Sequence, residues 1–162
     1  MNLSQQLAKH FREVNSGGNW TWSNLKDNLT DVTWEQATTK IPSYNTIAAL
    51  VYHIHYYIEI LIPVLQGGKL DGSDKYSFDV PPIHSKQEWD QLLEKSRRDA
   101  ETFAGIIEKM PETKLWENFP DPKYGNWLRN ILGVIEHTHY HLGQIVILKK
   151  MIQSQTSEEK TN

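Results

Sequence analysis

The chain has 162 residues, which is the usual size of one domain with a single hydrophobic core. Its 17 Lys and Arg residues and 20 Asp and Glu residues give a net charge of −3, so there is no general electrostatic attraction to nucleic acids or anionic membranes. The absence of cysteine excludes disulfides, zinc–thiolate sites, iron–sulfur clusters and cysteine nucleophiles. Any metal site must therefore use His, Asp or Glu.

The N-terminal region predicts short helices. An amphipathic helix is expected first, with apolar residues three or four positions apart at Leu3, Leu7, Phe11 and Val14. The pattern continues after two glycines at Trp22, Leu25, Leu29 and Val32. Thr33 and Gln36 have the spacing of a capping box, which predicts one brief helical turn. The N-terminus has no apolar stretch like that of a signal peptide, so we expect a cytoplasmic protein.

A long apolar helix is predicted from about Ser43 to Leu65. Its apolar residues occupy more than one face, as in a helix that is buried on several sides. This is the most apolar segment of the chain, but it contains two His residues, Glu59 and Pro63. We therefore interpret it as a core helix of a soluble protein, and we expect no membrane partner.

Residues 67–84 show no helical period and predict a long crossover connection. An extended chain of this length reaches about 60 Å, whereas the preceding helix is only about 32 Å long. The crossover can therefore return along the whole bundle, so that the next helix runs parallel to the previous one. Its acids lack the spacing of a calcium loop and are interpreted as solvated residues: Asp71, Asp74 and Asp79.

Two further helices complete the predicted fold. Ser85 and Glu88 have the spacing of a capping box before a helix over 86–110. Residues 126–152 are apolar on nearly all sides and predict a central helix. We expect an all-α four-helix bundle over 1–153, with a frayed polar tail over 154–162.

Five of the seven His residues fall in the two most apolar helices: His53, His55, His137, His139 and His141. A buried imidazole must form hydrogen bonds or bind a metal, because an unsatisfied buried polar group costs about 1 to 3 kcal/mol. His137 and His141 are four residues apart and share one helical face, whereas His139 points about 200° away. A third ligand from the other helix would complete a three-His site. Periodicity does not choose between His53 and His55.

These motifs resemble the DinB-like family of metal-dependent bacterial enzymes. The resemblance covers most of the chain and rests on NWTWSNLKDNL, on His53 in TIAALVYHIHYY, on the long crossover and on EHTHYHLGQI. It implies that His53, His137 and His141 together bind one divalent metal ion, nickel or zinc, and so selects His53 over His55.

The resemblance also carries expectations about fold and activity. It implies a bundle in up-down-down-up order, and it implies a homodimer. Characterised relatives include transferases and isomerases that use low-molecular-weight thiols, so the resemblance implies a small-molecule substrate of that kind. The chain shows no basic patch for DNA contact.

Two functional hypotheses remain open at this stage. The leading one is a metal-dependent hydrolase or small-thiol-dependent transferase, in which the ion activates a bound water or thiol. The alternative is a non-catalytic dimeric module that binds a metal or a small ligand. No convincing general acid or base distinguishes them, because Glu136 points about 100° away from His137 and Glu59 faces the site only if its helix is rotated. Weaker candidates for contacts around the site are Tyr57, Asn130 and Gln144.

Overall fold

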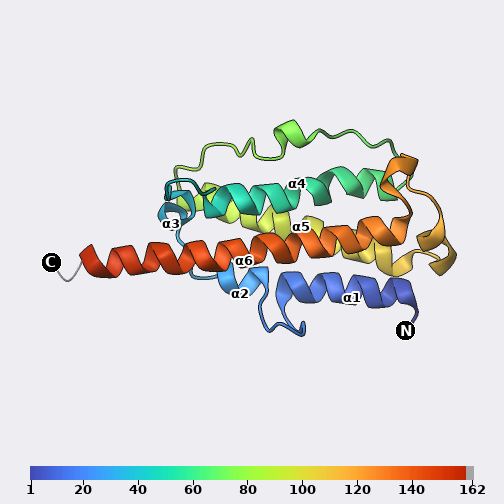
Figure 1. The fold of residues 1–162 in the computed structure, drawn as a ribbon, viewed down its shortest axis with the longest axis horizontal. Coiled ribbons are helices and arrows are strands. Elements are labelled where there is room, and N and C mark those ends of the chain that lie inside the picture. Colours follow the sequence, from blue (N-terminus) through green and yellow to red (C-terminus); the bar gives the residue numbers. More distant parts are fainter. Residues whose placement is uncertain (160–162) are drawn as a thin grey trace.

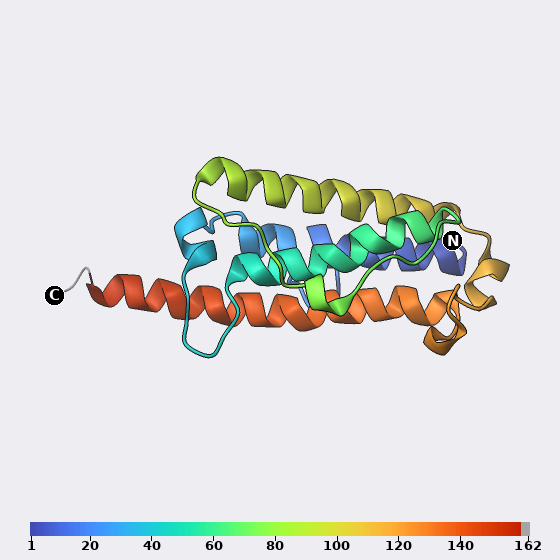
Figure 2. The same cartoon turned by 90° about the horizontal axis from the view of Figure 1, so that it is seen from above.

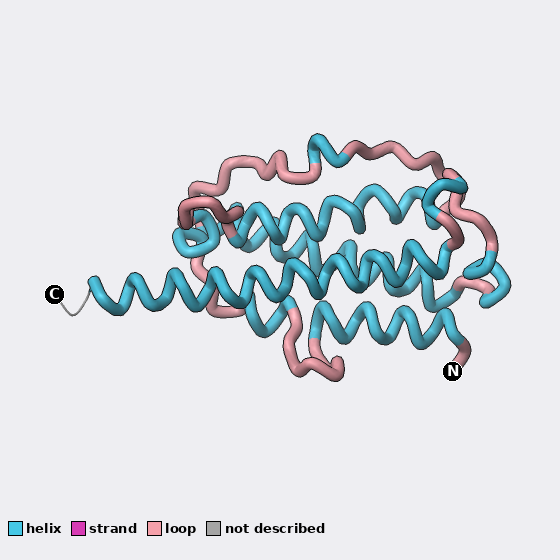
Figure 3. Tube along the Cα trace, in the orientation of Figure 1, coloured by secondary structure: helices cyan, strands magenta, loops and turns pink. Residues whose placement is uncertain are grey.

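The computed structural model describes residues 1–159, and within them every regular element is a helix. Figure 3 shows helices and loops only, and the one β-type pairing in this range is an isolated bridge between Asn118 and Asn126. The all-α prediction is confirmed. The α-helices are α1 (Leu3–Ser16), α2 (Leu25–Leu29), α3 (Trp34–Thr38), α4 (Ile47–Leu65), α5 (Lys86–Lys109) and α6 (Trp127–Glu159).

The four longer helices lie side by side (Figures 1 and 2). Helices α4 and α5 run in one direction, and α1 and α6 run in the other (Figure 1). Each of α1 and α4 packs against both α5 and α6. The rings of Phe11 and Phe103 meet between α1 and α5, with their centroids 4.9 Å apart. The core therefore lies along the common axis of the four helices, and α4 and α6 are neighbours in the bundle.

The helix starts follow local capping chemistry. Thr33 and Gln36 form the predicted capping box of α3. At α5 the Ser85 hydroxyl accepts from the Glu88 amide as predicted, but the Glu88 carboxylate accepts from the His84 amide, one residue before the cap. Helix α4 begins at Ile47, later than the predicted start near Ser43. The reason is that Ser43 has a left-handed φ of 69°, which cannot be part of a helix.

Helix α4 is the one described helix that is long and apolar enough to span a membrane by length and composition. In this structure 56% of its most apolar window is buried, and the helix packs against α5 and α6. A core helix passes the same test of length and composition. The buried residues of α4 include two of its polar side chains, His53 and His55.

The crossover between α4 and α5 returns along the outside of α4, as Figure 1 shows in green. It contains one short 3-10 turn, Asp74–Tyr76, which the sequence pattern did not predict. Helix α6 continues to Glu159, beyond the predicted end at residue 152, because no glycine or proline interrupts the intervening residues. The expected polar tail over 154–162 thus begins inside α6, and its last residues, 160–162, lie outside the described part of the chain.

Candidate metal centre

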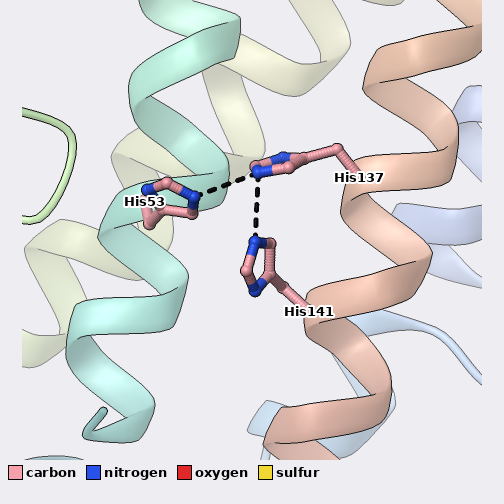
Figure 4. A group of neighbouring side chains, drawn as sticks. All are labelled: His53, His137 and His141. Atoms are coloured by element: carbon pink, nitrogen blue, oxygen red, sulfur yellow. Dashed lines mark hydrogen bonds between the residues drawn. The ribbon is translucent and has the colours of Figure 1, made fainter. Parts of the chain in front are cut away.

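Three imidazoles converge between α4 and α6. His53 projects from α4, and His137 and His141 project from successive turns of α6 (Figure 4). The Nε2 atom of His137 lies 3.0 Å from Nε2 of His53 and 3.1 Å from Nε2 of His141. His53 and His141 are buried and His137 is half-buried. The structure therefore brings together the three side chains that the resemblance implied, while their binding of a metal stays a prediction.

The other ring nitrogens determine which atoms face the centre. Nδ1 of His53 lies 3.2 Å from the carbonyl oxygen of Ser77, which can only accept a hydrogen bond. Nδ1 of His141 lies 2.7 Å from Oε1 of Gln144, which is also an acceptor. Both Nδ1 atoms therefore carry the proton, so both Nε2 atoms direct lone pairs at His137. Metal-binding His residues are oriented in the same way by carbonyl and carboxylate acceptors.

Two of the three nitrogen separations, 3.0 and 3.1 Å, match those around a single divalent ion. Two nitrogens that each lie about 2.1 Å from one ion are roughly 3.0 to 3.4 Å apart at right-angled or tetrahedral geometry. The three donor atoms all lie within 4.8 Å of one another. A neutral His137 can donate its single proton to only one of the two neighbouring lone pairs. Hydrogen bonding alone thus leaves the cluster incompletely satisfied, whereas a cation at its centre would bind all three nitrogens.

Burial favours the neutral form of two of the three imidazoles, His53 and His137. It lowers the pKa of His53, although the Ser77 carbonyl opposes this effect. Burial, together with the neighbouring His141 and His53, lowers the pKa of His137 to about 4. Since only neutral imidazole binds a metal, the lowered pKa of these two residues makes them available as ligands at neutral pH and below.

Aromatic residues surround the cluster. The Phe78 ring, from the crossover, stacks on His53 with centroids 3.8 Å apart. The Tyr57 ring makes T-shaped contacts with both His53 and His137, and its hydroxyl donates to Oδ1 of Asp74 at 3.0 Å. Asp74 is exposed, as expected for a solvated residue of the crossover, and its carboxylate also accepts a hydrogen bond from the Tyr57 hydroxyl.

The other His residues of the two clusters face elsewhere. His139 lies beside His10, with ring centroids 6.0 Å apart, on the side of α6 that meets α1. His55 faces α5, where its Nε2 lies 2.8 Å from the ammonium of Lys95. Glu59 also contacts Lys95, at 2.9 Å, and is not part of the three-His cluster. Helix α4 thus presents His53 and His55 to different neighbours.

A cavity of about 400 Å³ adjoins the cluster, with His137, Tyr57 and Asp74 in its wall. Two other residues considered from the sequence also line it. Asn130 donates to the carbonyls of Tyr124 and Asn126, and Glu136 is exposed at the rim. Sequence reasoning missed Ser77 and Phe78, because the contacts of an aperiodic crossover leave no pattern in the sequence.

The fold and the cluster define a class: helical proteins with a three-imidazole site between two antiparallel core helices. Within that class the chain belongs to the DinB superfamily, since the sequence profile of this superfamily matches residues 19–145. The matched region contains all three His residues of the cluster. A search of curated proteins gave no match, and neither did a search of solved structures.

Proposed function

We propose that this protein binds one divalent metal ion, nickel or zinc, through His53, His137 and His141. The observation that supports this proposal is the convergence of lone pairs on His137, with separations of 3.0 and 3.1 Å between Nε2 atoms. Three protein ligands leave at least one coordination position open, as in catalytic zinc sites. The bundle that carries the site has the up-down-down-up order.

The proposed activity is that of a metal-dependent hydrolase or a small-thiol-dependent transferase, acting on a small molecule in the cytoplasm. A bound ion of this kind lowers the pKa of a coordinated water or thiol and so supplies a nucleophile near neutral pH. The cavity would hold the substrate. The Tyr57 hydroxyl and the Asp74 carboxylate, which share a hydrogen bond, lie in its wall.

Metal binding is tested first. We expect purified protein to contain one divalent ion per chain by elemental analysis. Replacing His53, His137 or His141 with Ala should each weaken binding by more than the roughly 10- to 100-fold that loss of an outer-shell partner costs. The matched controls are His55→Ala and His139→Ala, whose side chains face Lys95 and His10 and should leave the stoichiometry at one.

The outcomes separate the hypotheses. Normal binding in all five variants would contradict the metal site. Loss of binding in His55→Ala but not in His53→Ala would identify His55 as the ligand from α4. If the ion is bound but an assay panel of small thiols, electrophiles and hydrolysable esters shows no turnover, the chain is a non-catalytic metal-binding module.

A further inference from the structure

The cavity beside His137 has the dimensions of a small-molecule site. Its volume is about 400 Å³, within the usual range for ligand pockets. Five apolar side chains line it: Ile60, Leu61, Leu70, Phe119 and Val134. Successive turns of α6 also line it, at Arg129, Gly133 and His137. A ligand in this space would touch both the apolar wall and a polar strip that ends at a proposed metal ligand.

Gly133 leaves the middle of that strip open. Glycine inside a helix costs about 1 kcal/mol relative to alanine, so a glycine in the interior of α6 is not favoured by the helix itself. A Cβ atom built on Gly133 meets no heavy atom within 4 Å. The space over this residue is therefore empty, and a side chain there would project into the cavity.

Arg129 lies at the other end of the strip, and part of its guanidinium has no hydrogen-bond partner in the described residues. Its Nη1 donates to the carbonyl of Tyr124 at 2.8 Å, which fixes the side chain. Within residues 1–159 the Nη1 bond to Tyr124 is the one side-chain hydrogen bond found for Arg129, and no carboxylate lies in ion-pair contact with it. The edge that carries Nε and Nη2 is the edge that binds carboxylates through two parallel hydrogen bonds.

We propose that the cavity binds a small carboxylate whose anionic end pairs with Arg129 and whose other end reaches the metal position beside His137. Eight residues of helix separate the two positions, which is about 12 Å along α6. The ligand therefore has an aliphatic or aromatic middle that lies over Gly133 and against the apolar wall. This proposal rests on the proposed metal function and adds the class of ligand to it.

The other charges of the cavity favour a carboxylate over a phosphate. Asp74 and Glu136 also line the space, and both are carboxylates. They would repel a phosphate dianion more strongly than a single carboxylate, whose charge one guanidinium balances. These charges therefore favour a group with a single negative charge as the partner of Arg129.

The test uses the Co²⁺-loaded protein, after its metal stoichiometry has been measured, and follows its visible absorption. The probes are the α,ω-dicarboxylates from glutarate to suberate, each compared with the monocarboxylate of the same length. We expect one dicarboxylate to bind at least about tenfold more tightly than its monocarboxylate, as a charge-assisted pair contributes. Arg129→Gln should abolish that advantage and leave the monocarboxylate unchanged. Inorganic phosphate should not compete.

Two glycine variants complete the test. Gly133→Leu should block the dicarboxylate with the Co²⁺ stoichiometry intact, whereas Gly105→Leu, on α5, should change neither. An unchanged dicarboxylate advantage in Arg129→Gln, or normal binding in Gly133→Leu, would overturn the proposal. If the protein binds no Co²⁺, the metal proposal fails separately. The carboxylate site is then tested on the metal-free protein by NMR. If the site exists, the dicarboxylate must shift the ¹⁵N signals of the Arg129 side chain and of Gly133.

Discussion

Gln144 determines the orientation of a proposed metal ligand, because its Oε1 accepts from Nδ1 of His141 at 2.7 Å. Loss of such a partner typically reduces metal affinity roughly 10- to 100-fold. We expect Gln144→Ala to weaken Zn²⁺ binding by about that factor, and Gln144→Glu to preserve it, because a carboxylate accepts the same hydrogen bond. Competition against a chromogenic chelator measures both affinities.

Asn130→Ala is the matched control for this prediction. The Asn130 amide also lines the cavity, but it donates only to backbone carbonyls at the start of α6. Its removal should leave Zn²⁺ affinity at the wild-type value. Equal affinities in Gln144→Ala and the wild type would show that the contact with His141 is structural only.

The lowered pKa of His137 links protonation to stability in the metal-free protein. Burial and the neighbouring His141 and His53 hold this pKa at about 4, whereas in the unfolded chain it is about 6.5. Between these values the unfolded state binds more protons, so the free energy of unfolding should decrease as the pH falls from 6.5 towards 4. Above pH 6.5 this residue should contribute no pH dependence.

Urea unfolding of the metal-free protein between pH 4.5 and pH 7.5 checks this sign. His137→Gln removes the titrating group and should give a flatter profile over the same range. A wild-type slope that persists unchanged in His137→Gln would assign the effect to other residues.

At the level of single residues, the sequence predicted the site residues whose spacing along a helix is informative. The four-residue interval between His137 and His141 predicted a shared face, and the structure places both rings on one centre. The choice between His53 and His55 could not be made from periodicity, because α4 is covered on both sides and both residues are buried. Only the family resemblance selected His53.

Among the elements, the crossover is held onto α4 by specific contacts. The Tyr56 hydroxyl donates to the Ser73 carbonyl at 2.8 Å and accepts from the Ser73 amide at 2.9 Å. The turn that follows places Asp74 on Tyr57 and the Ser77 carbonyl on His53. The position of the crossover and the orientation of His53 are therefore coupled through a few residues.

Tyr56→Phe removes both hydrogen bonds to Ser73 while it keeps the ring. We expect a loss of about 1 to 2 kcal/mol in the free energy of unfolding and faster amide hydrogen exchange over residues 73–77. Tyr140→Phe is the control, since this ring is 65% exposed and no hydrogen bond of its hydroxyl is found within the described residues. Unchanged exchange over 73–77 in Tyr56→Phe would mean that other contacts hold the segment.

The prediction of whole elements succeeded where a period or a cap was present. The helical spacing before Gly17 and the Ser85 cap before α5 both correspond to observed helices. The pattern through Trp22 failed, because Trp22 lies in a loop with a left-handed φ of 57° and is 92% exposed. Three-dimensional contacts of the crossover have no counterpart in periodicity, which is why its turn and its anchors were not predicted.

For the molecule as a whole, α6 has more apolar surface than its neighbours cover. Trp127, Ile131, Ile145 and Leu148 are buried as expected of a central helix. Leu132, Tyr140 and Ile147 are 38%, 65% and 59% exposed. At 100° per residue these three positions fall within a sector of about 80° on one side of the helix. An apolar stripe of this kind is typical of a contact surface with another protein.

We predict that this stripe on α6 is the contact of a homodimer, in which it packs against the same stripe of a second copy, as a twofold axis requires. Light scattering at micromolar concentration should give twice the chain mass of 18.9 kDa. The double variant Tyr140→Asp and Ile147→Asp should give the monomer mass with an unchanged helical circular dichroism spectrum, because a charge at each position opposes burial of the stripe.

Trp22→Asn, in the exposed loop, should stay dimeric. A monomer mass for the wild type would refute the homodimer, and a dimer in the double variant would place its interface on another face.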